Sequence, residues 1–194
     1  MINIPVQAHF LTLTIGTPEI VEHQVQRGRQ SYTQRERVIR TQEFPPRRTA
    51  SSLALSMAAV NRMFAAADVF FQLFGSTTDS VEAPNGRAAL DDPGFLMLAR
   101  QFPATRGVSL LLVGRFQGSE GGAAVESQAV CAVGDAAPDS SLAHEFGHLL
   151  GLNHQGDIRD MMNPGLSVPS PQLTSAEIAT IRNGRLVARF RGKP

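Results

Sequence analysis

The sequence is poor in the residues and patterns that mark several common protein classes. Its single cysteine, Cys131, excludes an intramolecular disulfide framework, and the apolar neighbours of this residue predict a buried core thiol. A formal net charge of +1 gives no electrostatic reason to expect a nucleic-acid partner or a membrane surface. No apolar run approaches the length of a membrane-spanning helix, and residues 1–15 lack the pattern of a signal peptide.

Histidine is also scarce, yet three of the five histidines belong to one run, His144 to His154, that reads H-E-x-x-H-x-x-G-x-x-H. Histidines four apart on a helix share a face, so His144 and His148 can reach one zinc ion at about 2.0–2.1 Å. Gly151 tolerates the left-handed conformation that ends a helix, so the chain can turn back and present His154 as the third ligand. Three protein ligands leave one position open, as in catalytic zinc sites.

The glutamate of this run completes the chemistry of a hydrolase. Zinc lowers the pKa of bound water towards about 7. Glu145 follows the first ligand and is placed to take a proton from that water and deliver it to a leaving amine. The sequence therefore predicts a zinc-dependent endopeptidase that uses a zinc-activated water, with Glu145 as general base. Two alternatives stay open: a narrow-specificity protease of the toxin or effector type, and a zinc-binding module that holds peptides without turnover.

The same run resembles the metzincin clan of zinc endopeptidases, whose motif is followed by a Met-turn. Residues 160–164 read Asp-Met-Met-Asn-Pro, and Met162 lies eight residues after His154. The resemblance gives Met162 the role of an apolar floor beneath the zinc site, with Met161 as the alternative. The Met-x-Pro form and this spacing are similar to the matrixin branch, while residues 60–71 look like a helix-to-strand passage of the pappalysin branch.

Several features of the branches of this clan are missing. Astacins and serralysins place a zinc-binding tyrosine two residues after the methionine, where this chain has Pro164. His9 and His23 are too few for the second, structural zinc of matrixins, and we expect both to be structural or solvated. One catalytic Zn²⁺ is the expected cofactor. Calcium stays open, because no loop has the spacing of a calcium motif although some loop aspartates could ligate the ion: Asp91, Asp92 and Asp135.

The length and the hydrophobic pattern predict one α/β (α+β) domain over residues 1–194, with about five strands and three main helices. The resemblance to metzincins implies that this is a catalytic domain with a twisted mixed sheet. The expected strands are 4–15, 68–74, 108–116, 123–128 and 129–133. The expected helices are 49–66, a short one near 94–102, an active-site helix capped by Asp139, Ser140 or Ser141, and a last one opened by a capping box at Thr174–Glu177. The resemblance implies a metzincin-like zincin fold, with an upper lobe (1–151) and a small lower lobe (152–194) around a cleft.

Two segments have an expected contact role. By resemblance, the edge strand of the cleft pairs with extended substrate backbone, and it is assigned to Gly122, Ala123, Ala124, Val125 and Glu126. Residues 17–48 are polar and arginine-rich, with an alternation at Val21, His23 and Val25 that is typical of a hairpin. This segment is a contact surface for an acidic partner or inhibitor or, as its glutamates favour, a solvated insertion.

The expected partner is a protein or peptide substrate, and the chain is expected to act as a monomer without a nucleic-acid or membrane partner. Most metzincins act outside the cell, so the resemblance implies secretion or export. The sequence itself does not decide the localisation, and a removed leader, another export route and a function inside the cell all stay open.

Overall fold

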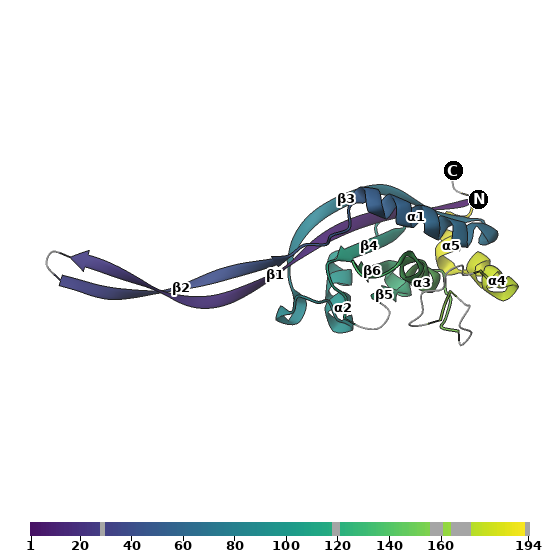
Figure 1. Ribbon diagram of the computed structural model, residues 1–194. Helices are drawn as coiled ribbons and strands as arrows, with labels where there is room; N and C mark the ends of the chain where they lie inside the picture. The colour runs from purple at the N-terminus through teal and green to yellow at the C-terminus, as the bar shows by residue number, and fades with distance from the viewer. Residues whose placement is uncertain (28–29, 118–120, 156–160, 164–171, 193–194) are drawn as a thin grey trace.

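The first strand, β1 (Ile2–Arg27), has two different surroundings along its 26 residues in the computed structural model. Residues 2–14 pair in parallel with β3 (Val69–Glu82), and residues 6–11 pair in parallel with β4 (Val108–Val113). The remainder pairs with β2 (Gln30–Phe44) and forms a long two-stranded arm that projects from the body of the molecule (Figure 1). The structure describes residues 1–27, 30–117, 121–155, 161–163 and 172–192.

The described residues form a six-stranded sheet in the order β2-β1-β4-β6-β5, with β3 beside β1. Leu13 of β1 pairs with β2 and also with β3, so these two strands lie on opposite edges of β1. β6 (Val130–Gly134) is parallel to β4, and β5 (Gly122–Val125) runs antiparallel to β6 at the far edge. The predicted mixed α/β fold is confirmed, and the strand beyond the expected five is β2.

Two hydrophobic clusters cover the two faces of this sheet. Alternate residues of β1 point to opposite faces, so Val6 belongs to one cluster and Leu13 to the other. The first cluster lies under α1 (Ala50–Phe64) and α3 (Asp139–Leu149), and the second under α2 (Asp92–Gln101). All six residues of β4 are buried, as expected for a central strand that is covered on both faces.

Two short helices close the described chain, α4 (Ser175–Asn183) and α5 (Arg185–Phe190). The predicted capping box is confirmed, since the Thr174 hydroxyl accepts a bond from the backbone of Glu177 and the Glu177 carboxylate accepts one from Thr174. Both helices pack into the same core as α1 and α3 through Ile181, Leu186 and Val187. Among the described residues, none of the helices combines the length and the apolar character needed to cross a bilayer.

The second predicted strand is longer than expected. It was expected at 68–74, but β3 continues to Glu82 because β1 offers it a parallel partner as far as Thr14. Residues 75–82 are mostly polar or half-exposed, so hydrophobic patterning does not mark them as a strand.

Candidate metal centre and active site

The N-cap of α3, the helix that carries the first two histidines, lies one residue before the first predicted cap. Pro138 is its N-cap residue, in an extended conformation, and the three predicted capping residues form the first turn: Asp139, Ser140 and Ser141. The prediction of a side-chain cap was wrong because serine and aspartate also suit the first turn. There the Asp139 carboxylate complements the positive end of the helix dipole.

α3 carries two of the predicted ligands on one face, one turn apart. The Nε2 atoms of His144 and His148 lie 3.1 Å apart, and the ring centroids 4.7 Å apart. His144 is buried, with 5% of its surface exposed, and His148 is half-buried. The i, i+4 spacing of the sequence therefore brings the two imidazoles to one point, as predicted.

The helix ends in a turn that redirects the chain at once. Gly151 has φ of 87°, its N–H donates to the carbonyl of His148, and the N–H of Leu152 donates to the carbonyl of Gly147. These two bonds form a Schellman motif, in which glycine is favoured because it adopts positive φ without steric cost. The predicted role of Gly151 is confirmed, and the chain returns along the helix to place His154.

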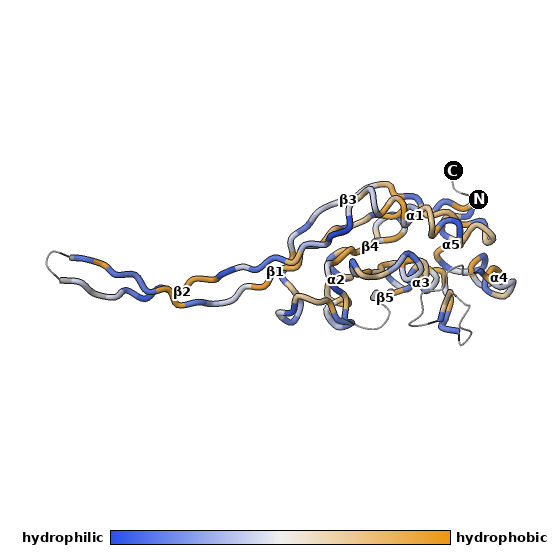
Figure 2. Tube along the Cα trace, in the orientation of Figure 1, coloured by the Kyte–Doolittle hydropathy of each residue, from blue (hydrophilic) through white to orange (hydrophobic). Residues whose placement is uncertain are grey.

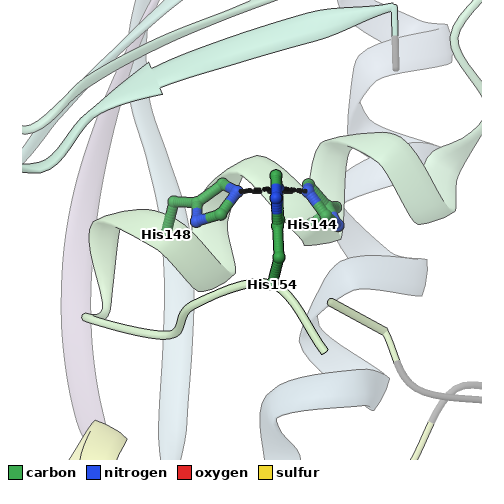
Figure 3. Close-up of side chains that lie close together, drawn as sticks. All are labelled: His144, His148 and His154. Carbon is green, nitrogen blue, oxygen red and sulfur yellow. Dashed lines mark hydrogen bonds between the residues drawn. The ribbon is translucent and has the colours of Figure 1, made fainter. Parts of the chain in front are cut away.

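The third imidazole completes a triangle of nitrogen atoms (Figure 3). Nε2 of His154 lies 3.2 Å from Nε2 of His144 and 3.1 Å from Nε2 of His148. Three nitrogens at about 2.0–2.1 Å from one tetrahedral ion would lie about 3.3–3.4 Å from one another, close to these separations. Among the described residues, this is the one group of three or more His, Cys, Asp or Glu side chains that lie close enough together to share a metal ion.

The opposite ring nitrogens of two histidines meet backbone carbonyls. Nδ1 of His144 lies 2.9 Å from the carbonyl oxygen of Met161, and Nδ1 of His148 lies 2.9 Å from that of Leu152. A carbonyl oxygen only accepts, so each Nδ1 carries the proton and each Nε2 presents its lone pair to the centre. This is the tautomer that a metal requires, and sequence patterns do not reveal these two carbonyls.

Both methionines of the expected Met-turn are buried, and each has a different place. Met162 is fully buried, and a Cβ atom on Gly147 of α3 would overlap its sulfur atom. Met161 contributes the carbonyl that holds His144, and the carbonyl of Met162 accepts a bond of 3.0 Å from the N–H of Gln155. Pro164, which completes the Met-x-Pro pattern, lies outside the described residues.

Glu145 lies on the buried side of α3, with 1% of its surface exposed, next to the edge strand β5. A Cβ atom on Gly122 would come within 2.9 Å of Oε1 of Glu145 and 2.7 Å of the Ala132 carbonyl oxygen, so only glycine fits there. The thiol of Cys131 is also fully buried. Burial raises its pKa well above the ordinary value, and the charge of Glu145 adds to the rise. The prediction of a buried core thiol is confirmed.

Four of the five predicted edge-strand residues lie in a strand at the edge of the sheet. Gly122, Ala123, Ala124 and Val125 form β5, which within the described residues pairs with β6 alone, so its other edge faces outward. Glu126 begins a 3-10 turn and is not part of the strand. Residues 126–128 were expected to be extended, but the chain must turn there to enter β6.

The remaining candidate residues are not brought to the cluster of three histidines. His9 lies 2.8 Å from the Thr77 hydroxyl and against the ring of Phe102, and burial lowers its pKa although Asp79 opposes that shift. His23 is exposed on the arm. Two of the aspartates considered for calcium accept backbone N–H bonds: Asp91 from Gly94, and Asp135 from Arg47 and Arg48.

Comparison with solved structures places this arrangement among known folds. An archaemetzincin from Methanopyrus kandleri matches with a TM-score of 0.57 and 13% identity, over 94% of each chain. The chain shares the archaemetzincin fold. A zinc-dependent peptidase from Methanocorpusculum labreanum matches 66% of this chain and 94% of its own, with 15% identity and a TM-score of 0.45. A chaperone–substrate complex matches 98% of this chain and 35% of its own, with 13% identity and a TM-score of 0.50.

No protein-family model and no curated protein sequence matches the chain. The archaemetzincin fold agrees with the zinc metallopeptidase fold that the histidine run predicted. The matrixin or pappalysin branch stays a prediction.

Proposed function

We propose that this protein is a zinc-dependent endopeptidase that hydrolyses peptide bonds in protein or peptide substrates. The observation that carries the proposal is the triangle of Nε2 atoms, 3.1–3.2 Å apart, with two of the three rings held by carbonyls in the ligating tautomer. The archaemetzincin-like fold supports it, because that structure has the same overall arrangement over 94% of its chain.

His144, His148 and His154 would hold the ion. Zinc bound to three histidines acts as a Lewis acid and makes a nucleophilic water available near neutral pH. The chain itself supplies the alignment of the imidazoles. The carbonyls of Met161 and Leu152 orient two of the rings, and second-sphere bonds of this kind raise ligand basicity and fix ring direction.

Glu145 would act as the general base. It directly follows the first ligand, and its carboxylate lies between α3 and the start of β5. In this role an oxygen of Glu145 accepts a proton from the attacking water and then delivers it to the nitrogen of the leaving amine. Burial keeps the carboxylate away from bulk water, so the proton is held close to the reacting groups.

The outward edge of β5 would bind the substrate. Its backbone groups can pair with an extended peptide, which gives affinity with little dependence on side chains. Because β5 begins at Gly122, beside Glu145, a peptide paired to this strand would pass close to the proposed base. The proposal also gives Met162 the role of the apolar floor of the site, since its side chain fills the space beneath Gly147.

The test pairs metal content with cleavage of casein and of a diverse peptide library. Wild type is compared with Glu145→Ala and with the matched control Glu82→Ala, which removes an exposed glutamate at the end of β3 that is not part of the histidine cluster. We expect about one zinc per chain in all three proteins. Cleavage should stop with a chelator and be absent in Glu145→Ala alone.

Two results would contradict the proposal. Cleavage that survives in Glu145→Ala would exclude the assigned base. One zinc per chain without cleavage of casein or of any library peptide would favour the binding module without turnover. Cleavage of a few library sequences, with casein left intact, would support the peptidase and point to the narrow-specificity form.

A further inference from the structure

The two-stranded arm is not explained by the proposed peptidase activity. It consists of residues 15–27 of β1 and residues 30–42 of β2, and within the described chain these strands pair with each other alone. Each therefore has one edge of unpaired backbone N–H and C=O groups. A two-stranded ribbon is marginally stable in water, and an open edge is a template for pairing with another strand.

The charges of the arm argue against a strongly charged partner. Residues 16–44 contain five arginines and four glutamates. Much of this charge is used within the arm: Arg35 donates to Glu22 at 2.8 Å, Arg40 pairs with Glu19, and His23 lies 3.6 Å from Glu36. An acidic partner or inhibitor, one of the two possibilities drawn from the sequence, would have to compete with these pairs.

The outer strand of the arm has a two-fold pattern in its own sequence. Residues 34–42 of β2 read Gln-Arg-Glu-Arg-Val-Ile-Arg-Thr-Gln, with Val38 at the centre. Glu36 and Arg40 lie two residues on either side of Val38, and Gln34 and Gln42 lie four residues on either side. Opposite charges at equal distances from a centre are what a self-complementary interface between identical strands needs.

In place of the monomer expected from the sequence, we propose that two copies of this chain form a dimer by antiparallel pairing of their β2 outer edges, with Val38 of each copy opposite Val38 of the other. In this register Glu36 of each copy faces Arg40 of the other, so two cross-strand pairs of opposite charge form. Glu19 and His23 extend each pair into its own arm. The two arms then form one four-stranded sheet.

The face of the arm opposite to the one that carries Glu36 and Arg40 also fits this dimer. It carries the exposed side chains of Pro18, Ile20 and Ile39, and the two isoleucines are 66% and 71% exposed. Figure 2 shows apolar stretches along the otherwise hydrophilic arm. In the proposed register Ile39 of one copy faces Arg37 of the other, whose cross-strand neighbour is Ile20. The three apolar side chains of each copy would be brought together across the dimer axis, with the aliphatic stems of Arg37 between them.

The register is specified by the same charges. A two-fold axis perpendicular to the sheet keeps the same face of both copies on the same side. Moving the centre of the pairing by one residue therefore shifts the partner of each residue by two positions. A register centred on Arg37 would place this residue opposite its own copy, and like charges in that position are destabilising. A register centred on Ile39 would leave Glu36 and Arg40 opposite uncharged residues, Gln42 and Val38.

The experiment measures the oligomeric state of the full zinc-loaded chain by analytical ultracentrifugation over a range of concentrations. We expect wild type to dimerise, and Glu36→Arg and Arg40→Glu to weaken dimerisation by roughly tenfold or more, since each places like charges opposite one another twice. The double variant Glu36→Arg/Arg40→Glu should recover the dimer. An equimolar mixture of the two single variants should form a heterodimer.

The control is Glu82→Arg, which makes the same change of charge as Glu36→Arg but on β3, outside the arm, and should dimerise like wild type. Zinc content and far-ultraviolet circular dichroism confirm that each variant is folded. A wild type that stays monomeric up to its solubility limit would overturn the proposal and leave the arm for a different partner. A dimer that is insensitive to the changes at residues 36 and 40 would also overturn it, because the register centred on Ile39 predicts that insensitivity.

Discussion

Replacing Met162 by alanine should separate the packing role of this residue from its proposed role at the metal centre. Met162 is fully buried in the core cluster shared by α1 and α3. Loss of a buried methionine side chain lowers the free energy of unfolding by about 2–5 kcal/mol, through lost burial and the cavity left behind. For a chain of this size that corresponds to a fall in Tm of roughly 5–15 °C.

The matched control is Met57→Ala, which removes the same side chain from α1 in the same cluster, where Met57 is 3% exposed. Both variants should lose similar stability in urea denaturation of the metal-free protein. Only Met162→Ala should also weaken zinc binding, by roughly tenfold, because it loosens the segment whose Met161 carbonyl holds His144. Affinity is measured by competition with a chromophoric chelator. Equal zinc affinity in both variants would refute the reasoning.

Three further predictions concern Gly122, His9 and Cys131. Gly122→Ala should retain zinc but slow peptide cleavage, because the added Cβ must displace the Glu145 carboxylate or the Ala132 carbonyl; unchanged kcat in a stopped-flow or fluorogenic assay would contradict this. His9 has a pKa below its unfolded value of about 6.5 because of burial. The unfolded chain therefore binds the extra proton first, and stability should fall as pH drops below about 6.5 and level off below the folded pKa. His9→Gln should remove that component from urea titrations at pH 5 and pH 7.5, and an identical pH dependence would show that other groups cause it. Cys131 should resist alkylation by iodoacetamide at pH 8 in the folded protein and react after denaturation, since burial raises its pKa and blocks access.

The cluster of three histidines could be predicted from the sequence because its geometry is local. His144, His148 and Gly151 belong to one helix and its C-terminal turn, whose dimensions depend little on the rest of the fold. The contact between His144 and the Met161 carbonyl could not be predicted from local geometry, because tertiary packing brings Met161 to the helix. One signal was available for this contact: Gly147 is a helix-weakening residue in mid-helix, and such a glycine often marks a close approach by another segment.

Elements at the edges of the fold were harder to predict. The alternation that marks a half-buried strand fades in the polar second half of β3, which is held by pairing with β1 and not by burial. The arm is similar: its side chains are mostly exposed, so hydrophobic patterning indicated a hairpin near Val21 without its extent. The predicted N-cap of α3 missed the observed one, Pro138, by at least one residue, because several neighbouring residue types suit a helix start.

The continuity of β1 gives the arm mechanical properties that a tethered loop would lack. Leu13 and Thr14, at the root of the arm, are paired on both sides, with β2 on one edge and β3 on the other. The root is thus the central strand of a three-stranded segment, and β1 continues from there between β3 and β4 in the body of the molecule. A force applied to the far end of the arm would therefore be transmitted through the backbone of β1 to the centre of the sheet.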